Sequence, residues 1–225
     1  NSYSQDFEGL LITDGAALSG DGWLVGANVF DPTGTNFLYN YFAFPAPNPG
    51  GGFSAIDSGQ GGVPQGTQQL SVYSDYNNST AHTNGEIIES IVFKESLIGA
   101  GDIGSTWDFS FDTKQGNIAS PSTAIAFIKT LDQNTFGLKQ FITVDTTTNA
   151  NWVSELLSIA VGTGGEVAGD IFQIGFSNRA TSFASSGVFY DNINLAAAAP
   201  AVPVPAAAWL FGSALAGLVV ARRKK

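Results

Sequence analysis

The chain has 225 residues, of which 44% are hydrophobic and only 12% are charged, which is enough for one sizeable core. A net charge of −10 argues against nucleic acid as a partner, because phosphate binding needs clustered Lys and Arg. With no Cys, disulfides and thiolate metal sites are excluded. The acidic composition suits a soluble exported protein and also suits calcium.

In the first half of the chain, short apolar runs alternate with turn signals. An opening strand is expected at residues 6–9. The oxygen-rich stretch 31–36 lacks the EF-hand pattern and is predicted to be a turn. Residues 44–66 hold four Pro and seven Gly, which predicts a long loop over one face. Further strands are expected at residues 70–73 and 87–93.

The second half shows the clearest strand pattern. At residues 106–112, Trp107, Phe109 and Phe111 alternate with polar residues, so Asp108 and Asp112 should share an outward face. Comparable patterns are found at residues 124–131, 141–145, 157–161, 172–176 and 187–195, and a helical turn is predicted at 149–156. Roughly eight to twelve strands predict an all-β fold, an antiparallel two-sheet jelly-roll β-sandwich.

Tryptophan and histidine offer little chemistry in this pattern. We expect Trp23, Trp107 and Trp152 to anchor the core. The only histidine, His82, lies among loop residues, so a catalytic triad or a His-rich metal site is hard to build. Paired carboxylates for glycoside hydrolysis are not excluded by spacing, but Glu89, Glu95 and their neighbours are explained by a polar sheet face.

The C-terminal segment has three parts in a fixed order. A short motif is followed by an apolar run at 207–221 and by a basic end; the motif comprises Val202, Pro203, Pro205 and Ala206, and the basic end Arg222, Arg223, Lys224 and Lys225. As a helix the run would span about 22 Å, short for a bilayer core of about 30 Å. The basic end fits a cytoplasmic position. The chain therefore divides into a domain at 1–195, a linker at 196–205 and a hydrophobic helix with a basic end at 206–225.

This tail resembles the PEP-CTERM sorting signal of Gram-negative bacteria in its VPxPA form. The resemblance implies an exported protein held in the membrane by its tail, a processing enzyme of the exosortase type as partner, and a place at the cell surface or in the extracellular matrix, often with exopolysaccharide and biofilm. A chain that opens at Asn1 is also expected to have lost a signal peptide. Whether the tail is cleaved or retained stays open.

The two ends of the domain carry a chemical argument. In the closing strand, Asn192 and Asn194 should face water, which places Asp191 on the inward side with Phe189 and Ile193. A buried carboxylate is costly unless it is paired or metal-bound, and no Lys or Arg lies within this strand. The alternative is that Asp191 bonds backbone amides at a sheet end while the N-terminal acid Glu8 is solvated.

The opening FE and the closing YDN-hydrophobic-x-L sequence resemble the jelly-roll carbohydrate-binding modules of the galactose-binding-like group. In that group an acid of the first strand and one of the last share a structural calcium. The resemblance implies a Ca²⁺ site at Glu8 and Asp191, with backbone carbonyls completing a shell of roughly six to eight oxygens.

Sugar contact needs an exposed ring beside amide or carboxylate groups. The candidates are Tyr39, Tyr41, Tyr76 and Asn77, although Tyr39 and Tyr41 also alternate as core strand residues do.

The sequence therefore predicts a non-enzymatic surface or matrix protein. It either binds extracellular polysaccharide or forms a homopolymer through edge strands or the C-terminal helix. The rival from another class is a secreted glycan-active enzyme, which requires two carboxylates about 5–10 Å apart across a cleft.

Overall fold

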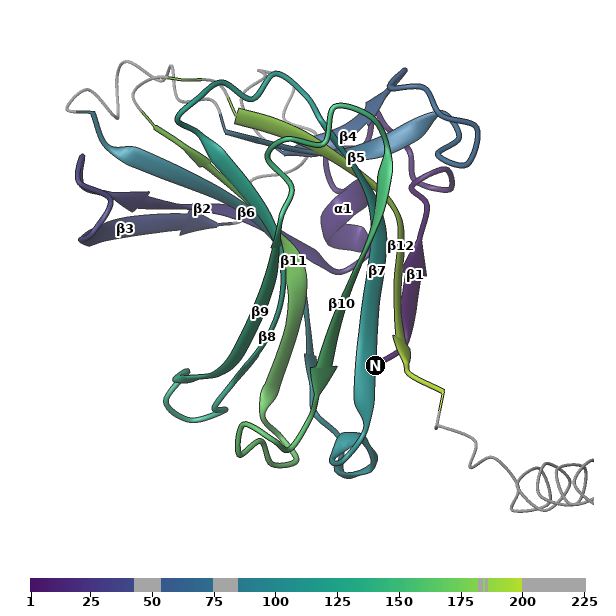
Figure 1. The fold of residues 1–225 in the computed structure, drawn as a ribbon, viewed down its shortest axis with the longest axis vertical. Coiled ribbons are helices and arrows are strands. Elements are labelled where there is room, and N and C mark those ends of the chain that lie inside the picture. Colours follow the sequence, from purple (N-terminus) through teal and green to yellow (C-terminus); the bar gives the residue numbers. More distant parts are fainter. Residues whose placement is uncertain (43–53, 75–84, 182–183, 185, 200–225) are drawn as a thin grey trace, which may run out of the picture.

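The computed structural model describes residues 1–42, 54–74, 85–181, 184 and 186–199. Within them the chain forms two six-stranded antiparallel sheets that pack face to face (Figure 1). The expected two-sheet β-sandwich is confirmed. The only helical elements described are the short α1 (Ala17–Gly20) and the 3-10 turn η1 (Ala100–Asp102).

The first sheet, called sheet A, has the order β10-β7-β12-β5-β4, and β1 also pairs with β12. Its strands are β1 (Tyr3–Gln5), β4 (Ala55–Ser58), β5 (Gln68–Ser74), β7 (Thr106–Gln115), β10 (Val153–Ala160) and β12 (Ser186–Ala197). The N-terminal strand and the last strand therefore lie side by side, which brings the two ends of the domain together (Figure 1).

The second sheet, sheet B, has the order β3-β2-β6-β11-β8-β9. Its strands are β2 (Trp23–Phe30), β3 (Phe37–Phe42), β6 (Ile87–Leu97), β8 (Thr123–Leu131), β9 (Leu138–Asp145) and β11 (Ile171–Ala180). Every strand expected from alternation in the second half of the chain is present, with bounds shifted by a few residues.

Aromatic rings fill the space between the sheets. Phe176 of sheet B stacks on Tyr190 of sheet A with ring centroids 3.8 Å apart, and it contacts Phe111 at 5.3 Å. All three side chains are almost fully buried, as are Trp23 and Phe109. Inward residues from alternate positions of both sheets thus interlock in one core.

Three local expectations were wrong. Residues 6–9 are a turn after β1, in which Phe7 adopts φ 59° while its ring is buried. The predicted helical turn at 149–156 runs into β10, because Val153 already pairs with Thr113 of β7. The expected loop at 44–66 contains β4, whose Ile56 is buried.

Two of the three predicted tryptophan anchors are confirmed, since Trp23 and Trp107 lie in the core. Trp152 does not. It is half-buried on the outer side of sheet A, where its indole N–H donates to the Gly61 carbonyl at 2.7 Å. The expected turn at 31–36 is confirmed, because an Asp31 carboxylate oxygen accepts the backbone N–H groups of Thr35 and Asn36.

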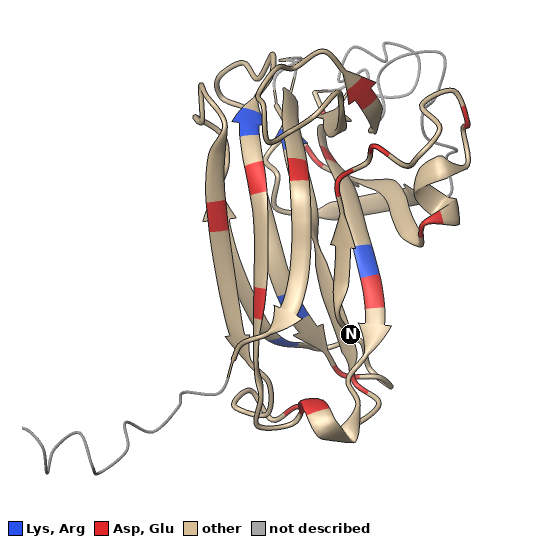
Figure 2. Cartoon of the chain, turned by 90° about the vertical axis from the view of Figure 1, so that its right-hand side faces the viewer, with Lys and Arg blue, Asp and Glu red and all other residues tan. Residues whose placement is uncertain are grey.

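Among the described residues, no helix is long and apolar enough to cross a membrane. The motif and tail from Val202 to Lys225, and His82, lie outside the described residues. In the cartoon of Figure 2, acidic positions along the chain are more frequent than basic ones.

Candidate functional site

The first candidate site lies where three strands of sheet A meet. Along one edge of β12, β5 pairs as far as Tyr190 and β1 begins its pairing at Ile193. Asp191 and Asn192 fall in the gap between these two partners. The chain leaving β1 turns at this gap, which brings Asp6 and Glu8 towards it.

A β-bulge sets the direction of Asp191. The pairing of β12 with β7 shifts register between Asp191 and Asn194, and Asn192 adopts φ 48°. Tyr190 and Ile193 both face the core, so Asp191 points to the outer side with its cross-strand neighbour Asp112. The expectation that Asp191 faces inward was therefore wrong, because the bulge changes the phase of the alternation.

Asp191 is nonetheless fully buried. One of its carboxylate oxygens accepts the Asn192 backbone N–H at 2.6 Å, and the other, Oδ2, has no hydrogen-bond partner. Burial, together with the charges of Asp112, Glu8 and Asp6, raises the pKa of Asp191 to about 7. The salt bridges among the described residues involve none of these four carboxylates.

A loop at residues 59–67 covers this part of sheet A. Gln65 and Asn192 both donate side-chain N–H groups to Asp112 Oδ2, at 2.7 and 2.8 Å. Lys114 Nζ donates to the Gln60 carbonyl at 2.6 Å. Asp112, predicted to be an exposed outward residue, is on the predicted face but buried beneath this loop.

Glu8 anchors the end of the loop. Its carboxylate accepts the backbone N–H groups of Thr67 and Gln68 and the Thr67 hydroxyl, at 2.6–2.7 Å. The Thr67 hydroxyl and these two amides lower the pKa of Glu8. Gly66, at φ 57°, makes the approach possible, because a Cβ there would lie 2.5 Å from Glu8 Oε1.

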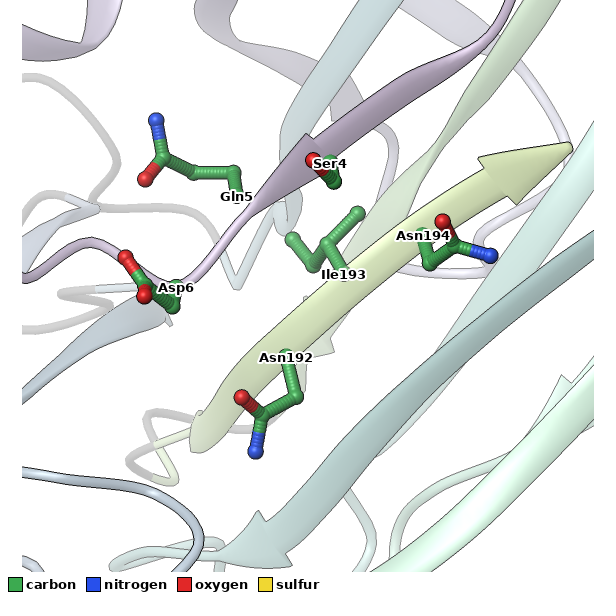
Figure 3. A pocket seen from close by; sticks show the side chains of 6 residues that line it. All are labelled: Ser4, Gln5, Asp6, Asn192, Ile193 and Asn194. Carbon is green, nitrogen blue, oxygen red and sulfur yellow. The ribbon is translucent and has the colours of Figure 1, made fainter.

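An open hollow of about 340 Å³ lies beside the junction, between β1 and β12 (Figure 3). Its lining is polar for the most part and comprises Ser4, Gln5, Asp6, Asn192, Ile193 and Asn194.

The junction can be tested against the predicted calcium. A buried, unpartnered carboxylate oxygen with neighbouring acids and, among the described residues, no salt bridge is chemically suited to a hard cation. No group of three or more His, Cys, Asp or Glu in the described part of the chain is arranged to hold a metal. A calcium ion here would therefore depend on Asp191 and Glu8, with backbone carbonyls as further ligands.

The second candidate site is a polar row on the outer side of sheet B. Asn40, Asn28, Glu89 and Arg179 stand opposite one another across β3, β2, β6 and β11. Glu89 accepts from the Asn28 amide at 3.0 Å and from the Ser177 hydroxyl at 2.8 Å. The row is exposed at its Asn40 end and half-buried towards its centre.

Two aromatic rings border this polar row. Phe37 and Phe30 pack edge to face with centroids 6.0 Å apart, and the Arg179 guanidinium lies 4.8 Å from the Phe30 ring. Phe37 is 55% exposed, so its ring is available to a ligand. This row could not be predicted from the sequence, because its members lie on four strands that only the sheet order brings together.

The predicted sugar-contact residues are distributed differently. Tyr41 is half-buried on the opposite face of β3, packed against Ala27, Ile88 and Ala180. Tyr39 shares that face and is 43% exposed. Tyr76 and Asn77 lie outside the described residues. The tyrosines of β3 therefore do not join the polar row.

No protein-family model and no curated protein matches the chain. Among solved structures, it is similar to a family 4 carbohydrate-binding module, at 14% identity over 79% of this chain and 96% of that chain, with a TM-score of 0.43. A carbohydrate-binding module of the β-sandwich superfamily matches at 11% over 87% and 62%, with a TM-score of 0.48. A Stig cyclase from Fischerella sp. TAU matches at 13% over 88% and 98%, with a TM-score of 0.45. These scores are too low to assign a function.

The junction predicts an unusual pH dependence of stability in the presence of a chelator. Because the folded-state pKa of Asp191 lies near 7 and its ordinary value is 3.8, the folded state binds this proton more tightly than the unfolded state. Stability should therefore fall as pH rises from about 4 to about 7, by at most about 4 kcal/mol. Urea unfolding of the wild type and Asp191→Asn at pH 5 and pH 8 measures this.

Asp191→Asn should lose most of the fall in stability between pH 5 and pH 8 that Asp191 causes. The control Asp108→Asn, on the same outer face of sheet A, should keep it. An unchanged pH dependence in Asp191→Asn would show that Asp191 titrates normally in the folded protein.

Proposed function

We propose that this chain is an exported, non-enzymatic surface protein that binds extracellular polysaccharide through the polar row of sheet B. The observation that carries the proposal is the line of Asn40, Asn28 and Glu89 beside the exposed ring of Phe37. Amide and carboxylate groups can bond sugar hydroxyls, while the ring supplies an apolar surface for a sugar face. The hydrogen bonds of Glu89 hold its carboxylate in position before a ligand arrives.

The acidic pairs noted in the sequence do not favour the enzyme. Glu89 and Glu95 are six residues apart on β6, or about 20 Å at 3.3 Å per residue. Asp108 and Asp112 are four apart on β7, or about 13 Å. Asp112 and Asp191 are direct neighbours, but both are buried. Glycoside hydrolysis needs two carboxylates about 5–10 Å apart that flank a substrate.

Substitutions in the polar row should weaken polysaccharide binding. Phe37→Ala removes the ring and Asn28→Ala removes the amide, and each should raise the Kd for the strongest hit of a glycan array about tenfold, or about 1.4 kcal/mol. Isothermal titration calorimetry measures the affinity. Tyr39→Phe, on the opposite face of the same edge, is the matched control and should bind as the wild type does. An array without hits, or equal affinity in Phe37→Ala, contradicts the proposal.

The same protein holds a structural Ca²⁺ at the junction, with Asp191 and Glu8 as its carboxylate ligands. The ion would stabilise the fold by offsetting the mutual repulsion of the buried acids and by tying the chain after β1 to β12. The unpartnered Asp191 Oδ2 supports this assignment. The ion has no role in a reaction here, since its effect is on stability.

Calcium should therefore raise the melting temperature of the wild type, and a chelator should lower it again. Asp191→Ala should abolish the response, since it removes the buried oxygen, and Glu8→Gln should weaken it. Differential scanning calorimetry with 1 mM-scale Ca²⁺, roughly the affinity range of extracellular sites, measures the shift. A response to calcium that survives in Asp191→Ala would place the ion elsewhere. No response in the wild type would contradict the proposed calcium site.

Export rests on the tail sequence. The motif from Val202 to Ala206 followed by the apolar run and basic end supports a sorting tail cut by an exosortase-type enzyme, at the surface of a Gram-negative bacterium. Such a protein is associated with exopolysaccharide and biofilm, in keeping with polysaccharide binding. Calcium and polysaccharide binding would be properties of the domain, whether or not the tail is present.

The intact mass of the native protein recovered from the cell surface tests this reading. We expect a chain that ends near Ala206, because cleavage is expected close to the Pro motif. The recombinant full chain is the mass standard. A native mass that includes Lys225 would contradict cleavage.

A second candidate, self-assembly into a surface fibre, is favoured by the edge strand β9. Its Leu138 and Phe141 are 59% and 49% exposed beside a backbone edge that has no partner strand in the described part of the chain. Ordered polymers without polysaccharide binding would favour this candidate over the first.

A further inference from the structure

A second line of polar side chains crosses the outer side of sheet B. Lys129 of β8 stands opposite Gln173 of β11, which in turn stands opposite Glu95 of β6. On the edge strand β9, Phe141 pairs with Lys129. We call these four residues the second polar row. Like the polar row that ends on β3, it draws its side chains from four strands and ends on an edge strand of the sheet.

In both rows a side-chain amide holds a carboxylate in place. Gln173 donates to Glu95 Oε2 at 2.6 Å, as Asn28 donates to Glu89 Oε2 at 3.0 Å. Gln173 is buried, whereas Glu95 is exposed. A fixed donor therefore orients a carboxylate that still faces solvent, which lowers the ordering cost of binding a ligand there.

Each row also has an exposed aromatic ring that rests on a second ring. Phe141 packs against Phe127 with centroids 6.0 Å apart, and Phe37 packs against Phe30 at the same separation. Phe141 is 49% exposed and Phe37 is 55% exposed. In both places the inner ring supports the outer one, and the outer ring offers an apolar surface to a ligand.

A cation lies near the inner ring of each pair. The Lys129 ammonium lies 4.9 Å from the centre of the Phe127 ring, and the Arg179 guanidinium lies 4.8 Å from that of Phe30. Arg179 also donates to the Gly34 carbonyl. No salt bridge among the described residues involves Lys129, so its ammonium can donate to a ligand.

The two rows are separate on the sheet. Glu89 and Glu95 are six residues apart on β6, or about 20 Å at 3.3 Å per residue. Between them, Ile91 and Phe93 form a buried apolar cluster with Phe127. A disaccharide is too short to contact both rows at once, whereas a longer sugar chain can reach from one to the other.

We propose that the second polar row is a second carbohydrate subsite, so that one polysaccharide chain is held at two points on sheet B. This inference rests on the proposed function, because it assumes the same class of ligand. Both rows supply an exposed ring for a sugar face, a held carboxylate for hydroxyls and a nearby cation. Because the sugar chain links the two contacts, its combined affinity can exceed that of either contact by roughly 10²–10⁴-fold.

Nuclear magnetic resonance of the ¹⁵N-labelled full chain distinguishes the two rows. The probe is a disaccharide cut from the polysaccharide that gives the strongest hit on a glycan array. We expect the side-chain amide signals of Asn28 and Gln173 both to shift. Phe141→Ala should abolish the shift of Gln173 and keep that of Asn28, and Phe37→Ala should do the reverse. The matched control Leu156→Ala, 60% exposed on the outer face of sheet A, should keep both shifts.

The intact polysaccharide provides the second measurement, by isothermal titration calorimetry. Phe141→Ala should raise its Kd about tenfold or more, because one of two linked contacts is lost. Glu95→Ala, at an exposed position, should raise the Kd as well and keeps the test decisive if Phe141→Ala does not fold.

The outcomes separate this inference from the proposed function. A shift of Asn28 alone, or a polysaccharide Kd that both variants leave unchanged, would overturn the second subsite and leave the proposed function intact. A shift of Gln173 alone would contradict the proposed function and two-point binding together. No shift of either amide would overturn both rows as carbohydrate sites.

Discussion

The structure depends most on how β12 is shared between partners. This strand pairs with β7 along most of its length, while its other edge is divided between β5 and β1. The bulge between Asp191 and Asn194 allows Tyr190 and Ile193 both to face the core although they are three residues apart. The same bulge turns Asp191 outwards against Asp112. One backbone irregularity therefore completes the core and creates a buried, uncompensated carboxylate, and these two effects cannot be separated.

Alternation made the fold predictable, since one residue in two had to be apolar wherever one face of a strand met the core. Trp107, Phe109 and Phe111 are the clearest case. The bulge was not predictable, because nothing in the local sequence requires Asn192 to adopt a positive φ. Glu8 and Asp191 were identified through resemblance and charge. The predicted inward direction of the Asp191 side chain was wrong, because the bulge changes the alternation along β12. The polar row of Asn28, Asn40 and Glu89 depends on strand order, which a local pattern does not contain.

The outer side of sheet B contains two chemistries on the same strands. On β6, Glu89 belongs to the polar row, whereas Ile91 and Phe93 form a buried apolar cluster with Phe127 of β8. A polymer of sugars can use both, because the hydroxyls of a pyranose bond polar groups while its CH faces contact rings. The polar row therefore argues for a sugar polymer over a purely apolar ligand.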